Sequence, residues 1–377
     1  MIKRFTVSRD DTVYEAFPDV VLTVSGKLVC VFAECTHHAD RSYTRVVVTT
    51  SVDRGRTWSA KRPVTEATHG IAFYNCPRIG RLQDGRLVVV VDKILTEARS
   101  KDPDSCHTLL TFSSDEGETW SDLVMTPARG IVPDRLLELS TGRWIVACHY
   151  DDTDFGNLVQ RLWYSDDQGA TWSPPVIVGR HRGLNLCEVS ILPVEGTRSA
   201  SLPRSASLPR PASLPRPASL PRLVAFHREN SGQGWDCYKT ISHDNGESWS
   251  EPVAFPLPGC HRPVAGWLQS GHVLITRRFM QGGQGWTGWW TQNLFAGLTD
   301  RASVLAPARS EAHTRILPVD FDRSTESDTG YSGWVQFEDG EIYIVNYIMD
   351  DAPKAQIRGY ALQMDDFILD QDYATLS

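Results

Sequence analysis

The chain has 377 residues and a formal net charge of −8, and its Lys and Arg residues are scattered along its length. This balance excludes a concentrated basic surface, so we expect neither nucleic acid nor an anionic membrane as a partner. The first ten residues include basic side chains, but no apolar segment follows them, which predicts neither a signal peptide nor a transmembrane helix.

The cysteines and histidines form no recognisable ligand pattern. The eight cysteines include no CxxC pair, and Cys30 and Cys148 lie within apolar runs, which favours buried thiols in a cytoplasmic protein. His37 and His38 are adjacent, and His149 lies elsewhere, without the spacing of a metal site. We therefore expect no metal, and the chemistry that the sequence indicates requires no cofactor.

Six segments along the chain share the form of a strand, a turn and an apolar strand. They are residues 17–32, 76–91, 132–147, 187–192 continued at 223–226, 262–275 and 333–345. Polar and apolar residues alternate in the first strand of each segment, which indicates an inner strand that faces a water-filled channel. The second strand is almost entirely apolar, which indicates burial on both faces. Six hairpins without helical periodicity predict an all-β fold, a six-bladed β-propeller of four-stranded antiparallel blades.

The same repeats predict the number of domains and suggest how the ring closes. Repeat architectures grow as one closed body, so we treat residues 1–377 as a single domain. Residues 357–369 are a candidate for completing the ring by pairing near the N-terminus.

A low-complexity insertion interrupts the fourth hairpin. Residues 198–222 repeat Ala-Ser-Leu-Pro-Arg with a six-residue period, where the other hairpins have a short turn. Proline at this density prevents strand pairing and favours extended, solvated chain. We interpret the segment as a tolerated surface insertion. The alternative is a basic arm that recruits a partner through its arginines, Arg204, Arg210, Arg216 and Arg222.

A turn motif of the form S-x-D-x-G-x-[TS]-W occurs four times, at residues 51–58, 113–120, 165–172 and 242–249. The Asp is suited to accept turn N–H groups, the Gly to adopt a positive φ, and the Trp to cover the apolar side of the hairpin. The motif resembles the Asp-box of the sialidase (neuraminidase) superfamily of β-propellers. In that family the box joins the two outer strands of a blade, far from the active site. The resemblance therefore implies a structural role for Asp53, Asp115, Asp167 and Asp244.

The same resemblance implies a catalytic set at the end of the axis where the inner strands begin. Asp40 follows the first hairpin, where sialidases have a general acid/base, and Tyr331 opens the sixth blade in Gly-Tyr-Ser-Gly, where they have a Tyr nucleophile. Glu188 opens the fourth blade and matches the Glu that activates this Tyr. Arg228 closes the second strand of that blade and matches one of three Arg residues that bind the carboxylate of the sugar.

The other arginines of this clamp match less completely. The first family Arg precedes the Pro of the first blade by two residues, and this chain has Ala16 there. The third is Arg277 or Arg278, with Arg262 as a weaker candidate, and a clamp rebuilt from Arg78, Arg262 and Arg277 is an alternative.

Other polar residues at strand ends extend this site. Asn75 and Arg78 resemble the opening of the second blade and complete the expected substrate-binding set. Glu15 and Asp19, beside the position of the missing Arg, favour a ligand with hydroxyl groups or a nearby cation.

Three functions follow from these residues. The first is an exo-acting, retaining glycoside hydrolase that releases a sialic-acid-like acidic sugar from a glycan or glycoconjugate. The second is a hydrolase or lyase for a different glycan on the same scaffold, which the Ala at the first clamp position favours. The third is a non-catalytic propeller that binds glycan or protein. Propellers carry many activities, so the fold alone does not choose among them.

Overall fold

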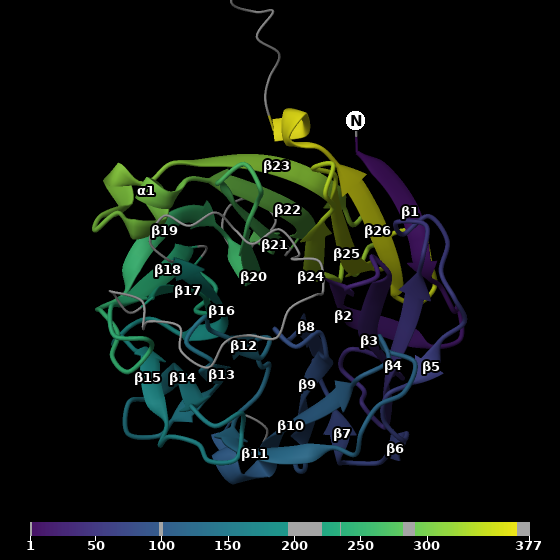
Figure 1. Ribbon diagram of the computed structural model, residues 1–377, viewed down its shortest axis with the longest axis horizontal. Helices are drawn as coiled ribbons and strands as arrows, with labels where there is room; N and C mark the ends of the chain where they lie inside the picture. The colour runs from purple at the N-terminus through teal and green to yellow at the C-terminus, as the bar shows by residue number, and fades with distance from the viewer. Residues whose placement is uncertain (1, 98–100, 195–220, 234, 282–290, 368–377) are drawn as a thin grey trace, which may run out of the picture.

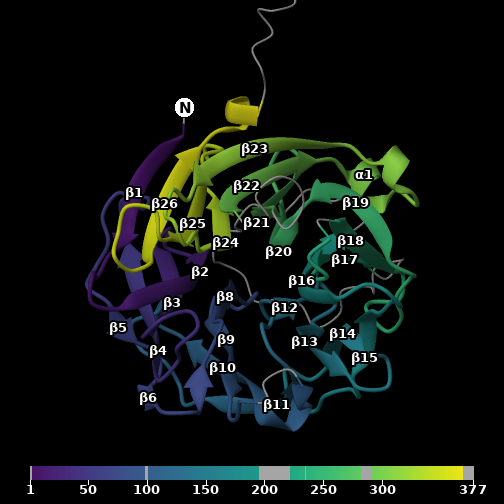
Figure 2. The same cartoon turned by 180° about the vertical axis from the view of Figure 1, so that it is seen from behind.

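A computed structural model describes residues 2–97, 101–194, 221–233, 235–281 and 291–367 of the chain. Six antiparallel sheets surround a central axis, and the chain passes from one sheet to the next around the ring (Figure 1). The view from behind shows the same ring of sheets around the axis (Figure 2). The predicted six-bladed β-propeller with four-stranded blades is therefore confirmed.

Each blade runs from an inner strand at the axis to an outer strand at the rim. Blade 1 consists of β2 (Tyr14–Leu22), β3 (Leu28–Cys35), β4 (Tyr43–Ser51) and β5 (Arg62–Pro63), with β6 (Thr68–His69) also paired to β4. Blade 2 has an inner strand in two parts, β7 (Phe73–Tyr74) and β8 (Arg78–Arg81), followed by β9 (Leu87–Ile94), β10 (Cys106–Ser113) and β11 (Val124–Arg129). Blade 3 consists of β12 (Leu137–Glu138), β13 (Trp144–Asp152), β14 (Asn157–Ser165) and β15 (Val176–Gly179).

The second half of the ring repeats this order. Blade 4 consists of β16 (Leu186–Val194), β17 (Arg222–Glu229), β18 (Asp236–Ser242) and β19 (Val253–Pro258). Blade 5 consists of β20 (Cys260–Trp267), β21 (Val273–Gln281), β22 (Thr291–Thr299) and β23 (Thr314–Phe321). Blade 6 consists of β24 (Thr329–Gln336), β25 (Ile342–Ile348), β26 (Gln356–Leu362) and β1 (Lys3–Ser8). The helical segments are short: η2 (Pro103–Ser105), α1 (Arg301–Leu305), η3 (Arg309–Glu311) and η4 (Met364–Phe367).

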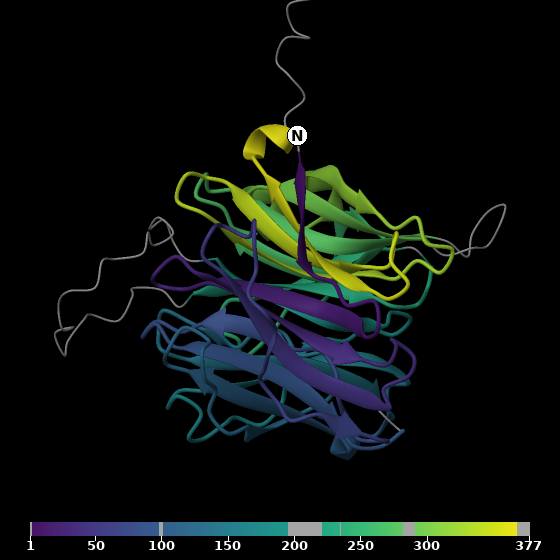
Figure 3. The same ribbon diagram turned by 90° about the vertical axis from the view of Figure 1, so that its right-hand side faces the viewer.

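Strand β1 closes the ring. It pairs antiparallel with β26, from Lys3 opposite Ala361 to Ser8 opposite Ile357, and forms the outer strand of blade 6. Figure 3 shows this purple N-terminal strand beside the yellow strands from the other end of the chain. Residues 357–361 of the candidate closing segment therefore do pair near the N-terminus. Each blade presents only one outer edge, which limits strand pairing with other chains.

The apolar core lies between the blades. All eight residues of β3 and all seven of β25 are buried, as expected for strands covered on both faces. In the cluster between blades 1 and 2, Val29 and Val31 pack with Ile79 and Val89. Each sheet is therefore stabilised by packing against its neighbours.

None of the described helices is long and apolar enough to cross a membrane.

The four turn motifs connect the third and fourth strands of blades 1 to 4. In the first, Ser51 Oγ donates to Asp53 Oδ1 at 2.8 Å and accepts the Gly55 N–H at 2.8 Å, while Asp53 Oδ1 accepts the Thr57 N–H at 2.9 Å. The hydrogen bonds from Thr57 and Ser51 lower the pKa of Asp53 to about 2. Equivalent contacts organise the turns around Asp115, Asp167 and Asp244. These aspartates therefore hold backbone groups of turns at the outer strands.

A second repeated feature, a residue with a positive φ angle, lies near the start of the inner strands. Phe17, Val132, Glu188, Arg262 and Tyr331 have positive φ angles of 59°, 52°, 44°, 50° and 53°. The strand register shifts across this position in blades 1, 4, 5 and 6, which marks a β-bulge. A bulge re-aims the side chain that it carries. The residues predicted to open blades 4 and 6 therefore occupy equivalent, bulged positions.

Two predicted segments lie outside the described residues. The repeats within 198–222 fall mostly among undescribed residues, between β16 and β17. The Gly/Trp run at 282–290 is likewise not described.

The Asp-box glycine of blade 1 provides a test of packing between blades. Gly55 has a φ of +80°, and an added Cβ would lie 2.2 Å from the Tyr343 ring of blade 6. We expect Gly55→Ala to lower the free energy of unfolding by about 1–3 kcal/mol more than Gly26→Ala. Gly26 is the matched control because its φ is +86° but no atom lies within 4 Å of the added Cβ. Urea denaturation of both variants measures the difference, and equal losses would contradict the proposed clash.

Candidate active site

Two bulged residues, Tyr331 and Glu188, meet at the end of the axis where the inner strands begin. Tyr331 Oη donates a 2.5 Å hydrogen bond to Glu188 Oε1. Arg228 Nη1 donates to the same carboxylate oxygen at 2.7 Å and lies 3.5 Å from Tyr331 Oη. The side chains of Tyr331 and Glu188 are both buried. The structure thus brings together three residues from β24, β16 and β17 that the sequence singled out separately.

Opposing effects set the charges of this group. Burial acts to raise the pKa of Glu188, but the charge and hydrogen bond of Arg228 lower it well below the ordinary value. Burial and the neighbouring Glu188 carboxylate raise the pKa of Tyr331. At neutral pH the group therefore contains a carboxylate, a guanidinium and a neutral phenol whose proton already points at the carboxylate.

Arg278, on β21, is the second cation at Tyr331. Its guanidinium carbon lies 5.0 Å from the centroid of the Tyr331 ring, and its Nη1 donates to Gln292 Oε1 at 2.8 Å. Arg278 is paired with His261 immediately before the blade 5 bulge, as Arg228 is paired with Cys187 in blade 4. The two arginines are therefore equivalent residues of adjacent blades.

Arg277, one of the two candidates for the third clamp arginine, lies elsewhere. Successive side chains of a strand point to opposite faces, so Arg277 and Arg278 diverge. Arg277 Nη1 donates to the Pro258 carbonyl at 2.7 Å, and its guanidinium lies 5.8 Å from the Phe279 ring centroid. Of the two candidates for the third arginine, Arg278 is the one beside Tyr331.

Arg262 and Arg78 lie on the axis but are engaged with other groups. Arg262 is 5.8 Å from the Tyr331 ring centroid, and its Nη2 donates to the Pro133 carbonyl at 2.6 Å. Arg78 pairs with Asp19 at 3.2 Å and donates to the Ser332 carbonyl at 3.1 Å. Burial lowers the pKa of Arg78 to about 9. These contacts connect blades across the axis.

The acidic residues near the missing clamp arginine are also engaged. Glu15 accepts hydrogen bonds from Lys61 Nζ and Ser8 Oγ, each at 2.7 Å. Asp19 is fully buried between Arg78 and Arg135. Nearby cations of the chain itself, Lys61, Arg78 and Arg135, therefore compensate these two negative charges.

Asn75 and Arg41 lie on the blade 2 side of the site. Asn75 Nδ2 donates to Asp92 Oδ2 at 2.9 Å, and its Oδ1 accepts a 3.4 Å hydrogen bond from Arg41 Nη2. The Arg41 guanidinium lies 4.8 Å from the Phe17 ring centroid, and its buried Nη1 has no hydrogen-bond partner among the described residues. Ala16, the residue before Phe17, is fully buried opposite Ala33. Arg41 was not predicted from the sequence, which gives no periodic signal in this loop.

Asp40 points into its own loop. Its side chain is exposed, and its Oδ1 accepts the Ser42 N–H at 2.9 Å. The hydrogen bonds from Ser42 lower the pKa of Asp40. From the same loop, His38 Nδ1 forms a 2.5 Å hydrogen bond with Asp328 Oδ2. The structure therefore brings His38, rather than Asp40, into contact with the partly buried carboxylate of Asp328.

Asp328 is a site residue that the sequence did not reveal. It lies three residues before Tyr331, and its carboxylate accepts hydrogen bonds from Tyr14 and, at 2.7 Å, from Tyr347. Burial acts to raise the pKa of Asp328, but the hydrogen bond and charge of His38 hold it at about 2. Arg278 Nη1 lies 3.8 Å from Asp328 Oδ1, so this carboxylate links His38 to the arginine above Tyr331.

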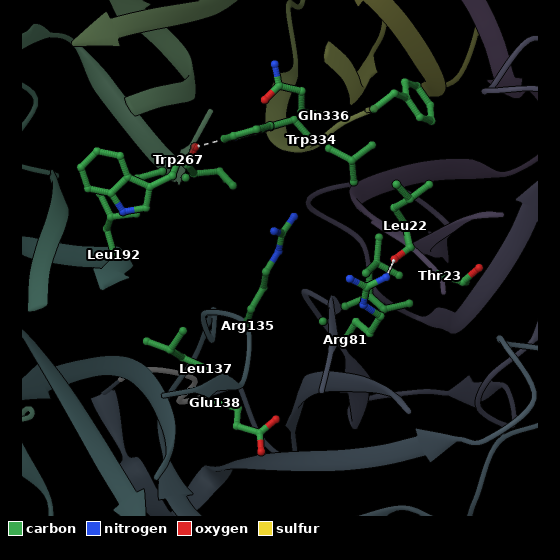
Figure 4. A pocket seen from close by; sticks show the side chains of 18 of the residues that line it. Leu22, Thr23, Arg81, Arg135, Leu137, Glu138, Leu192, Trp267, Trp334 and Gln336 are labelled. Atoms are coloured by element: carbon green, nitrogen blue, oxygen red, sulfur yellow. Dashed lines mark hydrogen bonds between the residues drawn. The ribbon is translucent and has the colours of Figure 1, made fainter. Parts of the chain in front are cut away.

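A cavity of about 1000 Å³ opens at the other end of the axis, where the inner strands finish. Figure 4 shows Arg135 projecting into it, between Trp267, Glu138 and Arg81. Arg135 is paired with Asp19, and Arg81 Nη1 donates to the Leu22 carbonyl at 2.9 Å. The cavity thus lies opposite the Tyr331 end, where carboxylates, arginines and tyrosines converge.

Comparisons with known proteins agree with this architecture. The family model described as BNR repeat-like domain matches residues 74–344. No significant sequence match to a curated protein was found. A protein of unknown function from Dyadobacter fermentans is similar in structure, with a TM-score of 0.71, 17% identity and coverage of 96% of this chain and 99% of that one.

Two solved sialidase structures also resemble the chain. Trypanosoma rangeli sialidase in complex with sialic acid is 17% identical, with a TM-score of 0.63 over 97% of this chain and 59% of that one. The intramolecular trans-sialidase from Ruminococcus gnavus is 14% identical, with a TM-score of 0.61 over 95% of this chain and 96% of that one. At these identities the similarity establishes a shared fold.

Buried His149 makes stability depend on pH. Its Nδ1 accepts the Glu188 N–H at 3.3 Å, and burial lowers its pKa to about 4. In the unfolded chain the imidazole returns to about 6.5. Between these values the unfolded chain binds a proton that the folded chain does not, so folding is favoured at high pH. The contribution is complete above pH 6.5 and is lost as the pH falls towards 4.

We expect His149→Gln to flatten the acid limb of the stability curve, because the Gln amide accepts the same hydrogen bond without titrating. The wild type should lose about 1.4 kcal/mol per pH unit from this residue between pH 6.5 and 4, or about 3 kcal/mol in all. Urea denaturation at pH 7, 5.5 and 4 compares the two slopes. Parallel slopes would show that His149 does not titrate in this way.

Proposed function

The chain belongs to the family of BNR repeat-like domains, and from this premise we propose that it is a retaining exo-glycosidase for a terminal acidic sugar of the sialic-acid type. The observation that carries the proposal is the hydrogen-bonded group of Tyr331, Glu188 and Arg228 at the axis. The sialidase with bound sialic acid has the same fold, which supports this class of substrate.

Tyr331 is the nucleophile in the proposed reaction. Its phenolic oxygen attacks the anomeric carbon, and the bond to the leaving oxygen breaks as the new carbon–oxygen bond forms. The phenolic proton passes to Glu188 Oε1, to which it is already hydrogen-bonded. Water then displaces the tyrosine from the sugar, and two inversions give overall retention.

A tyrosine suits a sugar whose anomeric carbon carries a carboxylate. A neutral phenol approaches such a carbon with less repulsion than a carboxylate nucleophile would. The raised pKa of Tyr331 keeps the phenol neutral until its proton is taken by Glu188. The nucleophile therefore becomes charged only as it forms the bond.

Arg228 and Arg278 are the proposed carboxylate contacts. Both are largely buried beside Tyr331, where a charge-assisted hydrogen bond contributes roughly 1.5–3 kcal/mol. A bound carboxylate would share Arg228 with Glu188 and weaken the pull of that arginine on the Glu188 charge. Substrate binding would thus raise the pKa of Glu188 and strengthen it as the acceptor of the Tyr331 proton.

A hydrolase or lyase for a different glycan, acidic or neutral, is the second candidate. The observation that favours it is Ala16, which is fully buried where the sialidase clamp has its first arginine. Loss of one such contact weakens binding by roughly ten- to a hundredfold. A sugar whose carboxylate needs only two arginines would not incur this loss.

Substitution of the nucleophile tests the proposal. We expect Tyr331→Phe to lower turnover by at least about a thousandfold, because the ring remains but the attacking oxygen is lost. The assay uses 4-methylumbelliferyl glycosides of sialic acid, deaminated sialic acid, a uronic acid and a neutral sugar. Circular dichroism and the melting temperature of the variant check that it folds.

Tyr343→Phe is the matched control. Its hydroxyl donates to the Gly55 carbonyl at 2.8 Å, in the outer turn of blade 1, so activity should be retained. Cleavage of a sialoside that survives Tyr331→Phe would contradict the mechanism. Tyr331-dependent cleavage of a uronic-acid substrate alone would support the second candidate, and saturable binding without turnover on the whole panel would indicate a binding protein.

A further inference from the structure

The proposed reaction needs a group that protonates the leaving oxygen, and Asp40 is poorly placed for it. Asp40 is exposed, its Oδ1 accepts the Ser42 N–H at 2.9 Å, and its carbonyl accepts the His37 N–H at 2.9 Å. These contacts hold the Asp40 side chain in a tight surface turn. Its pKa is lowered by the hydrogen bonds from Ser42, which makes it a weak proton donor near neutral pH.

His38, two residues earlier, is directed towards the axis. Its ring makes an edge contact with Phe17, with ring centroids 5.3 Å apart, and Phe17 makes an edge contact with Tyr331 at 5.1 Å. Phe17 is the bulged residue of blade 1, as Tyr331 is of blade 6. His38 and the nucleophile therefore flank the same aromatic ring.

Asp328 fixes the orientation of the His38 ring. Asp328 Oδ2 is 2.5 Å from His38 Nδ1, and its carboxylate is itself held by Tyr14 and Tyr347. The Asp328 side chain is 14% exposed and that of His38 is 40% exposed. An Nδ1 proton donated to a carboxylate leaves Nε2 to exchange a proton with a ligand.

We propose that His38, held by Asp328, is the general acid/base of this site in place of Asp40. This proposal rests on the function proposed above and identifies one further residue of the same reaction. His38 would be a catalytic residue that contacts the leaving oxygen. Asp328 would be a positioning residue that acts through His38.

The proton balance is complete with these groups. In the first step His38, protonated on both ring nitrogens, gives its Nε2 proton to the glycosidic oxygen as the carbon–oxygen bond breaks. Tyr331 bonds to the anomeric carbon and passes its phenolic proton to Glu188 Oε1. The products are a neutral alcohol, a neutral imidazole and a protonated Glu188. In the second step His38 Nε2 takes a proton from the attacking water, and Tyr331 leaves and regains its proton from Glu188. The enzyme returns to its starting charges.

The test compares two leaving groups on the sugar that the enzyme cleaves. An aryl glycoside releases a stable phenolate without help from an acid, whereas an alkyl glycoside needs its oxygen protonated. We expect His38→Gln to lower kcat/KM for the alkyl glycoside by roughly 100- to 10,000-fold and to affect the aryl glycoside far less. His37→Gln is the control from the same loop and should cleave both glycosides at near wild-type rates. Asp40→Asn tests the competing assignment and should show no selective loss on the alkyl glycoside.

A spectroscopic measurement tests the role of Asp328 independently of turnover. In the wild type, nitrogen NMR of the His38 imidazole should show a proton on Nδ1 with the strongly shifted resonance of a hydrogen bond to a carboxylate. Asp328→Asn should abolish that shift and reproduce the selective loss on the alkyl glycoside. An unshifted Nδ1 resonance in the wild type would overturn the positioning role.

The outcomes separate this proposal from the function on which it rests. Equal effects of His38→Gln on both glycosides, or a selective alkyl loss in Asp40→Asn, would overturn His38 as the acid while leaving the glycosidase intact. A wild type that cleaves neither glycoside, with any sugar of the panel, would overturn the proposed function and the role of His38 with it.

Discussion

The arrangement of the axis depends on a backbone constraint, the positive-φ bulge at the start of the inner strands. Five non-glycine residues have this positive φ, which costs roughly 1–2 kcal/mol per residue, and the strand register shifts at four of them. Strain of this kind persists where the surrounding structure determines it, and it is concentrated at functional sites. Here it turns Glu188 and Tyr331 out of their sheets and into hydrogen-bond contact. The strand pairings on either side of each bulge supply the rigidity that holds the two side chains together.

The site also depends on buried charged groups that compensate one another. Glu188 is stabilised as an anion by Arg228, and Asp328 accepts hydrogen bonds from His38, Tyr14 and Tyr347. Removing one member of such a group leaves the others buried without compensation, which is costly. Arg262, whose guanidinium lies 5.8 Å from the Tyr331 ring centroid, retains a buried Nη1 without a hydrogen-bond partner among the described residues, and so does Arg41 on the blade 2 side. A ligand that brings a negative charge would complete this balance.

The fold was predictable because its sequence signals are local and repeated. Each Asp-box specifies a turn, and each apolar strand follows the turn of its own hairpin. The convergence of Tyr331, Glu188 and Arg228 also followed, since each lies at a strand end. The sequence did not decide between Arg277 and Arg278, because a shift of one residue along a strand moves a side chain to the opposite face of the sheet. A bulge inserts an extra residue, so the alternation of faces cannot be followed along the sequence. Asp328 and the direction of His38 depend on irregular segments whose partners lie hundreds of residues away, as the His38–Asp328 hydrogen bond illustrates. The ion pair between Glu15 and Lys61 likewise could not be predicted, because no repeated spacing in the sequence relates the two residues.

The pairing of β1 with β26 has a consequence for synthesis on the ribosome. β1 precedes the other strands of the ring in the chain, yet among the described residues it pairs only with β26, whose residues are translated some 350 positions later. Until β26 is translated, β1 lacks this partner, and its edges remain available to other chains. Contacts between such distant residues are also slow to form. The pairing of β1 with β26 should therefore be among the last steps of folding, because it needs the strand of the described ring that is translated last.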